Sequence, residues 1–261
     1  MALNWIKSIE TVPIETLYLL ERCQIEWIAE EGREADWSAV FQAHPDLAWY
    51  FAHKAPAKAD WVRHVSAMPP SPDPLRLVEQ RVLLSIEDWI VYAIDPDIYN
   101  EQPFNRWDER ELTGMTDYAG KRVVDIGSGT GKQLFALAPL CAWAYAVEPV
   151  SRLRDYLKQK ADRLGCSNVS VVDGLMEALP FEDSFADVVV AGHVFGDRVQ
   201  AEYDEMLRVV KPGGMIILVP GNVDQDNEQH AFLMAHGFSF SVFEEPGDGP
   251  KRKYWLTVPF V

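Results

Sequence analysis

The pattern of apolar and polar positions changes near residue 120. Before it, apolar residues recur at helical spacing, which predicts a series of helices. The proline-rich stretch 68–74 and the Asp95-Pro96 pair interrupt this series, because neither fits a helix interior. The predicted helices cover 14–29, 36–41, 45–51, 60–67 and 75–93. We therefore assign residues 1–115 to a helical N-terminal region.

After residue 120, short apolar runs alternate with amphipathic segments, which is typical of strands alternating with helices. The runs that predict strands are 122–126, 143–147, 168–172, 185–191, 215–219, 238–243 and 254–258. The segments that predict helices are 132–137, 151–164, 201–210 and 225–235, with a break at 211–214. Five strands separated by helices, then a hairpin, predict an α/β fold. We expect a doubly wound, mainly parallel sheet with one antiparallel strand, formed by residues 116–261.

A glycine-rich turn follows the first predicted strand. Asp125 is followed by glycines at alternate positions, Gly127, Gly129 and Gly131, with Ser128 between the first two. Glycines let a backbone approach a ligand closely, and the start of the next helix offers free N–H donors. This arrangement predicts a nucleotide-like ligand at the carboxyl end of the strand.

Acidic residues end or follow the first three predicted strands. They are Asp125, Glu148 and Asp173. If these strands are neighbours, the three carboxylates line one crevice, because the carboxyl ends of parallel strands share one edge of the sheet. The acid after the second strand can accept both hydroxyls of a ribose, and the one after the third can accept an exocyclic amine.

Two classes of cofactor remain open at this point. A dinucleotide requires the spacing G-x-G-x-x-G, but Lys132 stands where its last glycine belongs. The acidic crevice also disfavours a pyrophosphate. A sulfonium cofactor with an amino-acid tail is cationic and matches an acid such as Asp125.

The motifs from Val123 to Gly214 resemble those of the class I S-adenosylmethionine-dependent methyltransferases, in particular the small-molecule enzymes of the ubiquinone and menaquinone type. Asp125 to Gly131 is similar to the first motif of that family, and Glu148 to its ribose-binding acid. The Asp173-Gly174 pair and 178–181 resemble its adenine-binding segment, and 205–214 its turn before the fifth strand. The resemblance implies a Rossmann-like sheet with strand order 3-2-1-4-5-7-6 and an antiparallel seventh strand.

This resemblance implies a set of cofactor contacts and a reaction. The cofactor, S-adenosylmethionine, is expected to lie against the following residues: Asp125, Gly127, Ser128, Gly129, Gly131, Glu148, Pro149, Asp173, Gly174, Leu175 and Gly192. We expect a methyltransferase that transfers a methyl group to a small-molecule acceptor. The alternatives are a regulatory or partner protein that binds the cofactor without transferase activity, and a nicotinamide-dependent oxidoreductase.

His193 is the candidate catalytic residue, because it lies just past the fourth predicted strand. A general base is needed only when the acceptor must lose a proton, so a purely packing role is the alternative. Trp89, Tyr92, Tyr99 and Trp107 are candidates for an apolar acceptor pocket, in which the N-terminal helices would form a lid. Plain packing of a helical cap onto the sheet is the alternative for each of them.

Charge and cysteine content restrict the partners. Acids outnumber bases 40 to 24, a net charge of −16, with most of the excess before Gly120. Such a surface repels phosphate backbones, so we expect no nucleic-acid partner and a neutral or cationic acceptor. The three cysteines show no metal or disulfide spacing, the scattered histidines predict no metal site, and no apolar run is long enough to span a membrane. We expect a cytoplasmic protein with no membrane partner.

Overall fold

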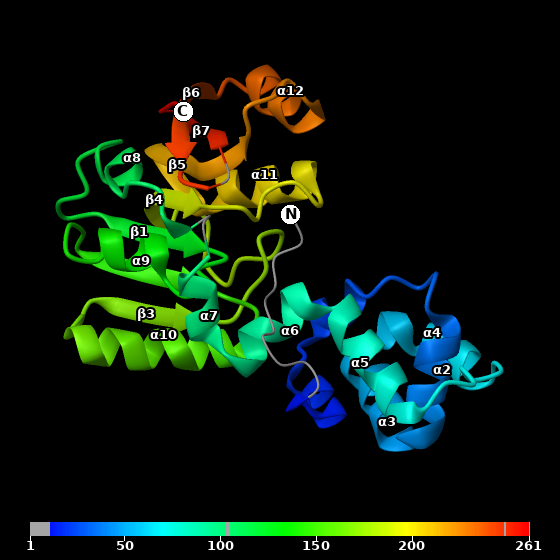
Figure 1. Cartoon of the computed structure of the whole chain (residues 1–261). Helices are drawn as coiled ribbons and strands as arrows, with labels where there is room; N and C mark the ends of the chain where they lie inside the picture. The colour runs from blue at the N-terminus through cyan, green and yellow to red at the C-terminus, as the bar shows by residue number, and fades with distance from the viewer. Residues whose placement is uncertain (1–10, 103–104, 248, 261) are drawn as a thin grey trace. The chain divides into compact units, whose positions relative to one another are not determined.

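The computed structural model describes residues 11–102, 105–247 and 249–260 (Figure 1). The chain forms two compact units, Met1–Tyr99 and Asn100–Val261. Residues 100–115, which the sequence pattern places with the helices, include Trp107 and Leu112. Both side chains are buried in the apolar core of the second unit.

The first unit is helical throughout its described part. Its elements are η2 (Ile14–Leu19), α1 (Arg22–Glu26), α2 (Glu34–Ala43), α3 (Pro45–Lys54), η3 (Pro56–Lys58), α4 (Ala59–Ser66), α5 (Leu75–Ser85) and α6 (Glu87–Ile94), with α7 (Pro96–Asn100) at the junction. Two long helices predicted from the sequence are each divided. Leu20 is extended and separates η2 from α1, and Ile86 leaves helical geometry between α5 and α6.

Aromatic side chains fill the core of the first unit. Trp37, Phe41, Phe51 and Trp61 form a cluster with ring centroids 5.4–5.8 Å apart. All four are at most 8% exposed. Edge-to-face and tilted pairs at this distance are favourable beyond the burial of their area. Trp37 and Trp61 are therefore core residues, whereas Trp49 is 63% exposed.

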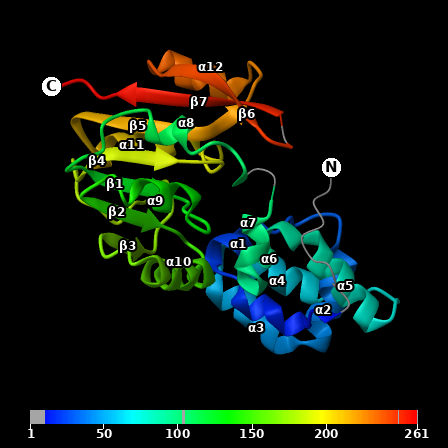
Figure 2. The same ribbon diagram turned by 60° about the vertical axis from the view of Figure 1, so that its left-hand side comes forward.

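The second unit contains a seven-stranded sheet (Figure 2). Its strands are β1 (Arg122–Ile126), β2 (Trp143–Val147), β3 (Val169–Val172), β4 (Ala186–Ala191), β5 (Val210–Val223), β6 (Ser239–Glu245) and β7 (Gly249–Thr257). The order is β3-β2-β1-β4-β5-β7-β6. Among these strands β7 alone runs in the opposite direction, so its pairs with β5 and β6 are antiparallel and the other pairs are parallel. The mainly parallel sheet and the strand order implied by the family resemblance are both confirmed.

Helices cover both faces of this sheet. Its helices are α8 (Arg110–Thr113), α9 (Lys132–Leu137), α10 (Ser151–Leu164), α11 (Val199–Val209) and α12 (Glu228–Ala235). Leu112, Leu137 and Leu157 of α8, α9 and α10 pack on one face, whereas Met206 and Leu233 of α11 and α12 pack on the other. The fold is therefore doubly wound, and the carboxyl ends of β1 to β5 are left for a site.

The fifth strand is longer than the pattern predicts. β5 begins at Val210, which pairs with Ala186, and the register then shifts before Met215 pairs with Val188. The Lys211-Pro212-Gly213-Gly214 stretch is thus an irregularity inside the strand and not a turn before it. A bulge accommodates proline and glycine where a regular ladder does not. Among the described residues, no helix is both long enough and apolar enough to cross a bilayer.

Candidate functional site

The glycine turn joins β1 to α9 through left-handed backbone. The φ angles are 65° at Gly127, 54° at Gly129 and 85° at Gly131, which forms the N-cap of α9. The amides of Gly127 and Ser128 donate to the carbonyl of Val147 at 2.9 and 3.2 Å. Positive φ favours glycine, so the alternate glycines are required by this turn, which is fixed to the end of β2.

Two of these glycines also have close neighbours. A Cβ at Gly127 would lie 2.5 Å from Cγ1 of Val194, and one at Gly131 would lie 2.5 Å from the Phe135 ring. The Ser128 hydroxyl is buried and donates to the backbone carbonyl of Asp125 at 2.9 Å. The turn is therefore held by hydrogen bonds and by side chains that pack closely against Gly127 and Gly131.

Glu148 follows β2 and is only 4% exposed. Its Oε2 accepts the amide of Gly129 at 2.8 Å and its Oε1 accepts that of Val150 at 2.9 Å. Each carboxylate oxygen has a second lone pair, which can still accept a hydroxyl. Burial raises the pKa of Glu148 to about 7.

Asp125 is the most unusual group at the strand ends. It is 2% exposed, and its Oδ2 makes no hydrogen bond within the described part of the chain. Burial, and next the charge of Glu148, raise the pKa of Asp125 to about 7. A buried acid with a perturbed pKa beside an open backbone turn is a candidate for binding a cation.

Asp173 differs from the other two acids. Its side chain is 70% exposed and lies 3.1 Å from Nη1 of Arg154. Arg154 is fixed in turn, because it donates to the carbonyls of Glu148 and Pro149 at 2.8 and 2.7 Å. The three acids do follow neighbouring strands, as expected, but only Asp125 and Glu148 are buried.

The segment after Asp173 is tightly packed. A Cβ at Gly174 would lie 2.8 Å from Cγ1 of Val147 and 2.9 Å from Pro180. Leu175 forms an isolated antiparallel bridge with Ala178, whose amide donates to the Leu175 carbonyl at 3.0 Å. The half-buried Leu175 side chain is therefore placed near the end of β3.

Gly192 and His193 follow β4. A Cβ at Gly192 would overlap the amide nitrogen of Gln133, which donates to the carbonyl of Val219. His193 has a φ of 62°, uncommon for a residue with a side chain. Its amide donates to the carbonyl of Pro220 at 3.0 Å.

Two charged residues near His193 were not singled out from the sequence. Glu245 ends β6 and is fully buried, with Oε1 3.3 Å from Nε2 of His193. Lys251 of β7 is 7% exposed, and its Nζ lies 3.5 Å from Oε2 of Glu245. The signal available in the sequence is the alternation along β6, which places Glu245 on the same face as the buried Phe243.

The aromatic residues predicted to line an acceptor pocket have different environments. Trp107 is 2% exposed and its ring centroid lies 6.2 Å from that of Phe243, so this residue packs in the core of the second unit, which is the packing alternative. The Lys132 ammonium lies 5.3 Å from the Trp107 ring and 3.3 Å from Glu109. Lys132 therefore has a structural role. The Tyr92 side chain lies outside the described atoms.

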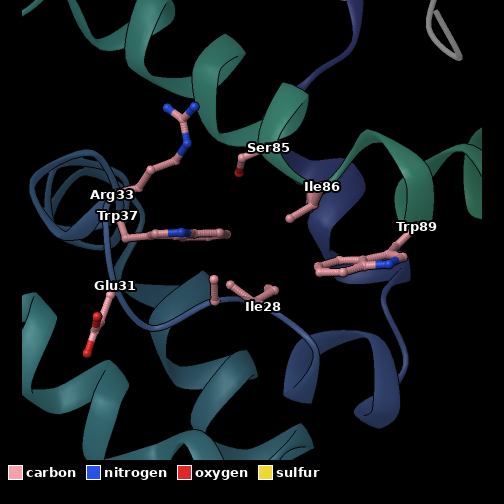
Figure 3. Close-up of a pocket in the computed structure, with 9 residues that line it drawn as sticks. Ile28, Glu31, Arg33, Trp37, Ser85, Ile86 and Trp89 are labelled. Carbon is pink, nitrogen blue, oxygen red and sulfur yellow. The ribbon is translucent and has the colours of Figure 1, made fainter. Parts of the chain in front are cut away.

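Described residues line a cavity in each of the two units. One of about 360 Å³ lies beside Gly131 and is lined by polar side chains that include Lys132 and Lys160. The other, of about 340 Å³, lies in the first unit. Figure 3 shows Ile28 and Ile86 between the indole rings of Trp37 and Trp89 in this second cavity. Trp89 thus lines an apolar cavity in the helical unit.

Comparison with known proteins finds relatives of the region that contains these strand ends. Residues 124–218 match the family model described as a methyltransferase domain. An uncharacterized methyltransferase of Bacillus subtilis, YcgJ, is 32% identical over 111 residues, 41% of this chain and 44% of that protein. A demethylmenaquinone methyltransferase of Bacillus cytotoxicus is 31% identical over 133 residues, 48% of this chain and 55% of that protein. The chain spans about half the length of these curated relatives.

A solved structure shares the fold. The crystal structure of a SAM-dependent methyltransferase from Aquifex aeolicus aligns with a TM-score of 0.51 at 21% identity, covering 63% of this chain and 99% of that one. The resemblance to methyltransferases and the predicted Rossmann-like fold are confirmed. The matched region contains Asp125, Glu148 and His193, whereas Glu245 and Lys251 lie beyond it.

Proposed function

Residues 124–218 are a methyltransferase domain, and from this premise we propose that the protein is an S-adenosylmethionine-dependent methyltransferase with a small-molecule acceptor. The observation that carries the proposal is the buried Asp125 carboxylate, whose Oδ2 lacks a hydrogen bond in the described structure and lies at the start of a bare glycine turn. An ammonium group donates to such an acid and restores its charged form.

The residues at the strand ends fit the three parts of this cofactor. Asp125 accepts the ammonium of the amino-acid tail, while the backbone at Gly127 and Gly129 lies close to it. Glu148 is held by two backbone amides and accepts the ribose hydroxyls with its remaining lone pairs. Ser128, Gly131, Pro149 and Gly192 shape the walls around these contacts.

The adenine is assigned to the segment after β3. Gly174 leaves no room for a side chain next to Val147, so the backbone there stays close to the sheet. Leu175 supplies an apolar surface, and Asp173 accepts the exocyclic amine while it stays next to Arg154. Because Asp173 is exposed, we assign it a smaller share of the affinity than Glu148.

The bound cofactor supplies an activated methyl group, and the protein aligns the acceptor with it and excludes water. His193 lies at the carboxyl end of β4, the strand next to β1. We assign it the role of general base, which accepts the proton that the acceptor loses. A base of this kind contributes about 10²- to 10⁴-fold to a rate.

The acceptor is assigned to small, neutral or cationic molecules. The net charge of −16 disfavours polyanions such as nucleic acids. The relatives named demethylmenaquinone methyltransferase support a small acceptor. A lid role for the N-terminal helices stays a prediction, and a variant that lacks residues 1–75 tests it through activity and acceptor selectivity.

Calorimetry and isotope transfer test this function. S-adenosylmethionine and S-adenosylhomocysteine should bind, NAD should not, and label from the methyl group should enter an acceptor in a metabolite extract. Asp125→Asn should weaken binding, whereas Asp155→Asn on the exposed face of α10 should leave it unchanged. Binding without transfer would indicate a cofactor-binding protein. A folded protein that binds neither compound would contradict the proposal.

A further inference from the structure

A buried charge cluster lies at the same edge of the sheet as the cofactor residues. Glu245 is 0% exposed, and neither of its carboxylate oxygens makes a hydrogen bond within the described residues. Its charged neighbours are Nε2 of His193 at 3.3 Å and Nζ of Lys251 at 3.5 Å. An ionised carboxylate in such a place requires partners, because burying an unpaired charge is costly.

The sheet brings these residues together from distant parts of the sequence. β6 and β7 form an antiparallel pair in which Phe243 faces Lys251, and β7 also pairs with β5. β5 in turn lies beside β4, after which His193 is held through its amide by Pro220 of β5. Glu245 and Lys251 thus lie on strands, which hold side chains more precisely than loops do, and His193 lies in the turn after β4, where its amide is bound to Pro220.

The chemistry of the pair fixes the position of a proton on His193. A carboxylate only accepts hydrogen bonds, and the ring nitrogen that faces it must donate. Nε2 lies 3.3 Å from Oε1 of Glu245, so a proton on Nε2 is the arrangement that this contact favours, and in that tautomer Nδ1 carries the lone pair. Hydrogen bonds to one ring nitrogen set the role of the other in this way.

Lys251 completes the cluster by neutralising Glu245. Its ammonium is itself almost buried, so its attraction to the carboxylate is little screened by water. This ammonium supplies the positive charge that a buried carboxylate requires.

We propose that Glu245, paired with Lys251, is a positioning residue that orients the His193 ring as the Nε2–H tautomer, with Nδ1 as the basic atom, for an acceptor that must lose a proton. The proposal rests on the proposed methyltransferase function. It narrows the acceptor to a molecule with a hydroxyl, an N–H or an acidic C–H at the methylated atom. An acceptor already deprotonated in water, or a tertiary amine, would not use this cluster.

A lone pair of the acceptor forms the new bond to the methyl carbon, and the bond between that carbon and sulfur breaks with its electron pair going to sulfur. The proton of the acceptor moves to Nδ1 of His193. The imidazolium formed is stabilised by Glu245 and later releases the proton to solvent.

Nitrogen NMR of the histidine ring tests the proposal without any acceptor. In protein labelled with ¹⁵N-histidine, at neutral pH and with S-adenosylhomocysteine added, the His193 signals should show the neutral Nε2–H tautomer. His193→Ala identifies the signals. In Glu245→Gln the amide can donate or accept, so a mixture of tautomers should appear.

His230 provides an internal control. Its ring contacts Tyr254 and lies 3.5 Å from Asp226, so its signals should respond to Asp226→Asn and not to Glu245→Gln. A wild-type His193 ring with its proton on Nδ1 would overturn the proposal even if no variant folds. So would a tautomer that Glu245→Gln leaves unchanged. Failure of the methyltransferase function is measured separately, as absence of cofactor binding or methyl transfer.

Discussion

The ionisation of the Asp125 and Glu148 carboxyl groups is expected to make the stability of the site depend on pH. Burial raises the pKa of each to about 7, and at Asp125 the charge of Glu148 adds to this rise. A carboxyl whose pKa is higher in the folded than in the unfolded state binds more protons when folded. The stability that this proton uptake contributes is fully present below the pKa of the unfolded chain, near 4. It is lost as the pH rises through the folded-state pKa, about 7.

Asp125→Asn should therefore flatten the pH dependence of stability. The ligand-free wild type is expected to lose melting temperature between pH 5 and pH 8, and the variant should lose less because it has one such acid fewer. Thermal melts at half-unit steps of pH measure this. Asp155→Asn, an exposed matched change, should follow the wild type. A D125N curve parallel to the wild-type curve would show that Asp125 is ionised throughout.

Cofactor affinity should have the opposite pH dependence. Asp125 must be charged to bind an ammonium, so the affinity for S-adenosylhomocysteine should rise from pH 6 to pH 8, by at most about tenfold per pH unit for one proton. Calorimetry at several pH values measures this rise. In D125N the affinity should be low and nearly independent of pH, and a slope as steep as that of the wild type would contradict this explanation.

Gly131 and Gly165 provide a matched pair. Both have positive φ, 85° and 67°, but a Cβ at Gly131 meets Phe135 and Leu157 within 2.8 Å, whereas one at Gly165 meets nothing within 4 Å. Gly165→Ala should cost about 1 kcal/mol from backbone strain. Gly131→Ala should cost a further ~1–3 kcal/mol from overpacking. Urea unfolding measures both, and equal costs would show that the turn adapts without strain.

The sequence predicts which residues lie at the strand ends, but it does not predict which groups they contact. Glycines at alternate positions after Asp125 have few other uses, so the turn was predictable. Glu148 and Asp173 look alike in the sequence, yet Arg154 keeps one at the surface while backbone amides bind the other. Glu245 lies 52 positions after His193, and only the strand order brings them together.

At the level of elements, α11 holds the segment between β3 and β4. Arg208 donates to the carbonyls of Leu179 and Phe181 at 3.2 and 2.8 Å, and pairs with Asp183 and Glu205. Glu205 also accepts the amide of Leu179 at 2.7 Å. This network fixes the chain that follows the proposed adenine contacts.

Arg208→Met should loosen that chain. Losing hydrogen bonds from a charged donor to carbonyls and carboxylates costs about 1–3 kcal/mol, and we expect weaker binding of S-adenosylhomocysteine as well. Urea unfolding and calorimetry measure the two effects. Lys158→Met on α10 removes a long exposed ion pair and should change neither. Unchanged affinity in the Arg208 variant would show that this network does not contribute to cofactor binding.

Element boundaries were predictable where the chain carries stop signals. Gly165 ends α10 in a left-handed conformation, and α10, β1 and β2 have the predicted bounds. The two breaks inside the long helices predicted in the N-terminal region lack such signals. Glu21 and Gln24 form a capping box that starts α1 inside a predicted continuous helix, and the pattern of apolar residues does not reveal this change.

At the level of the whole molecule, each unit has its own apolar core. We therefore expect two calorimetric transitions, because separate cores unfold separately. S-adenosylhomocysteine at about 100 times its Kd should stabilise only Asn100–Val261, by about 2.7 kcal/mol. NAD should shift neither transition.

Phe51→Ala identifies the transition of the helical unit. Phe51 is 0% exposed, and its truncation should cost about 3–5 kcal/mol. The variant should lower one transition and leave the ligand-sensitive one in place. A single transition that responds to both the ligand and the variant would show that the units unfold together.

The two backbone hydrogen bonds of Glu148 have a kinetic consequence. They are made by protein groups alone, so they hold the Gly129 turn and the Val150 segment in their binding geometry. Capture of a nucleoside then requires little ordering of the chain, and its rate is set mainly by diffusion and collision geometry. The Gly129 and Val150 amides should accordingly exchange slowly with deuterium in the unliganded protein, whereas in Glu148→Ala both should exchange rapidly.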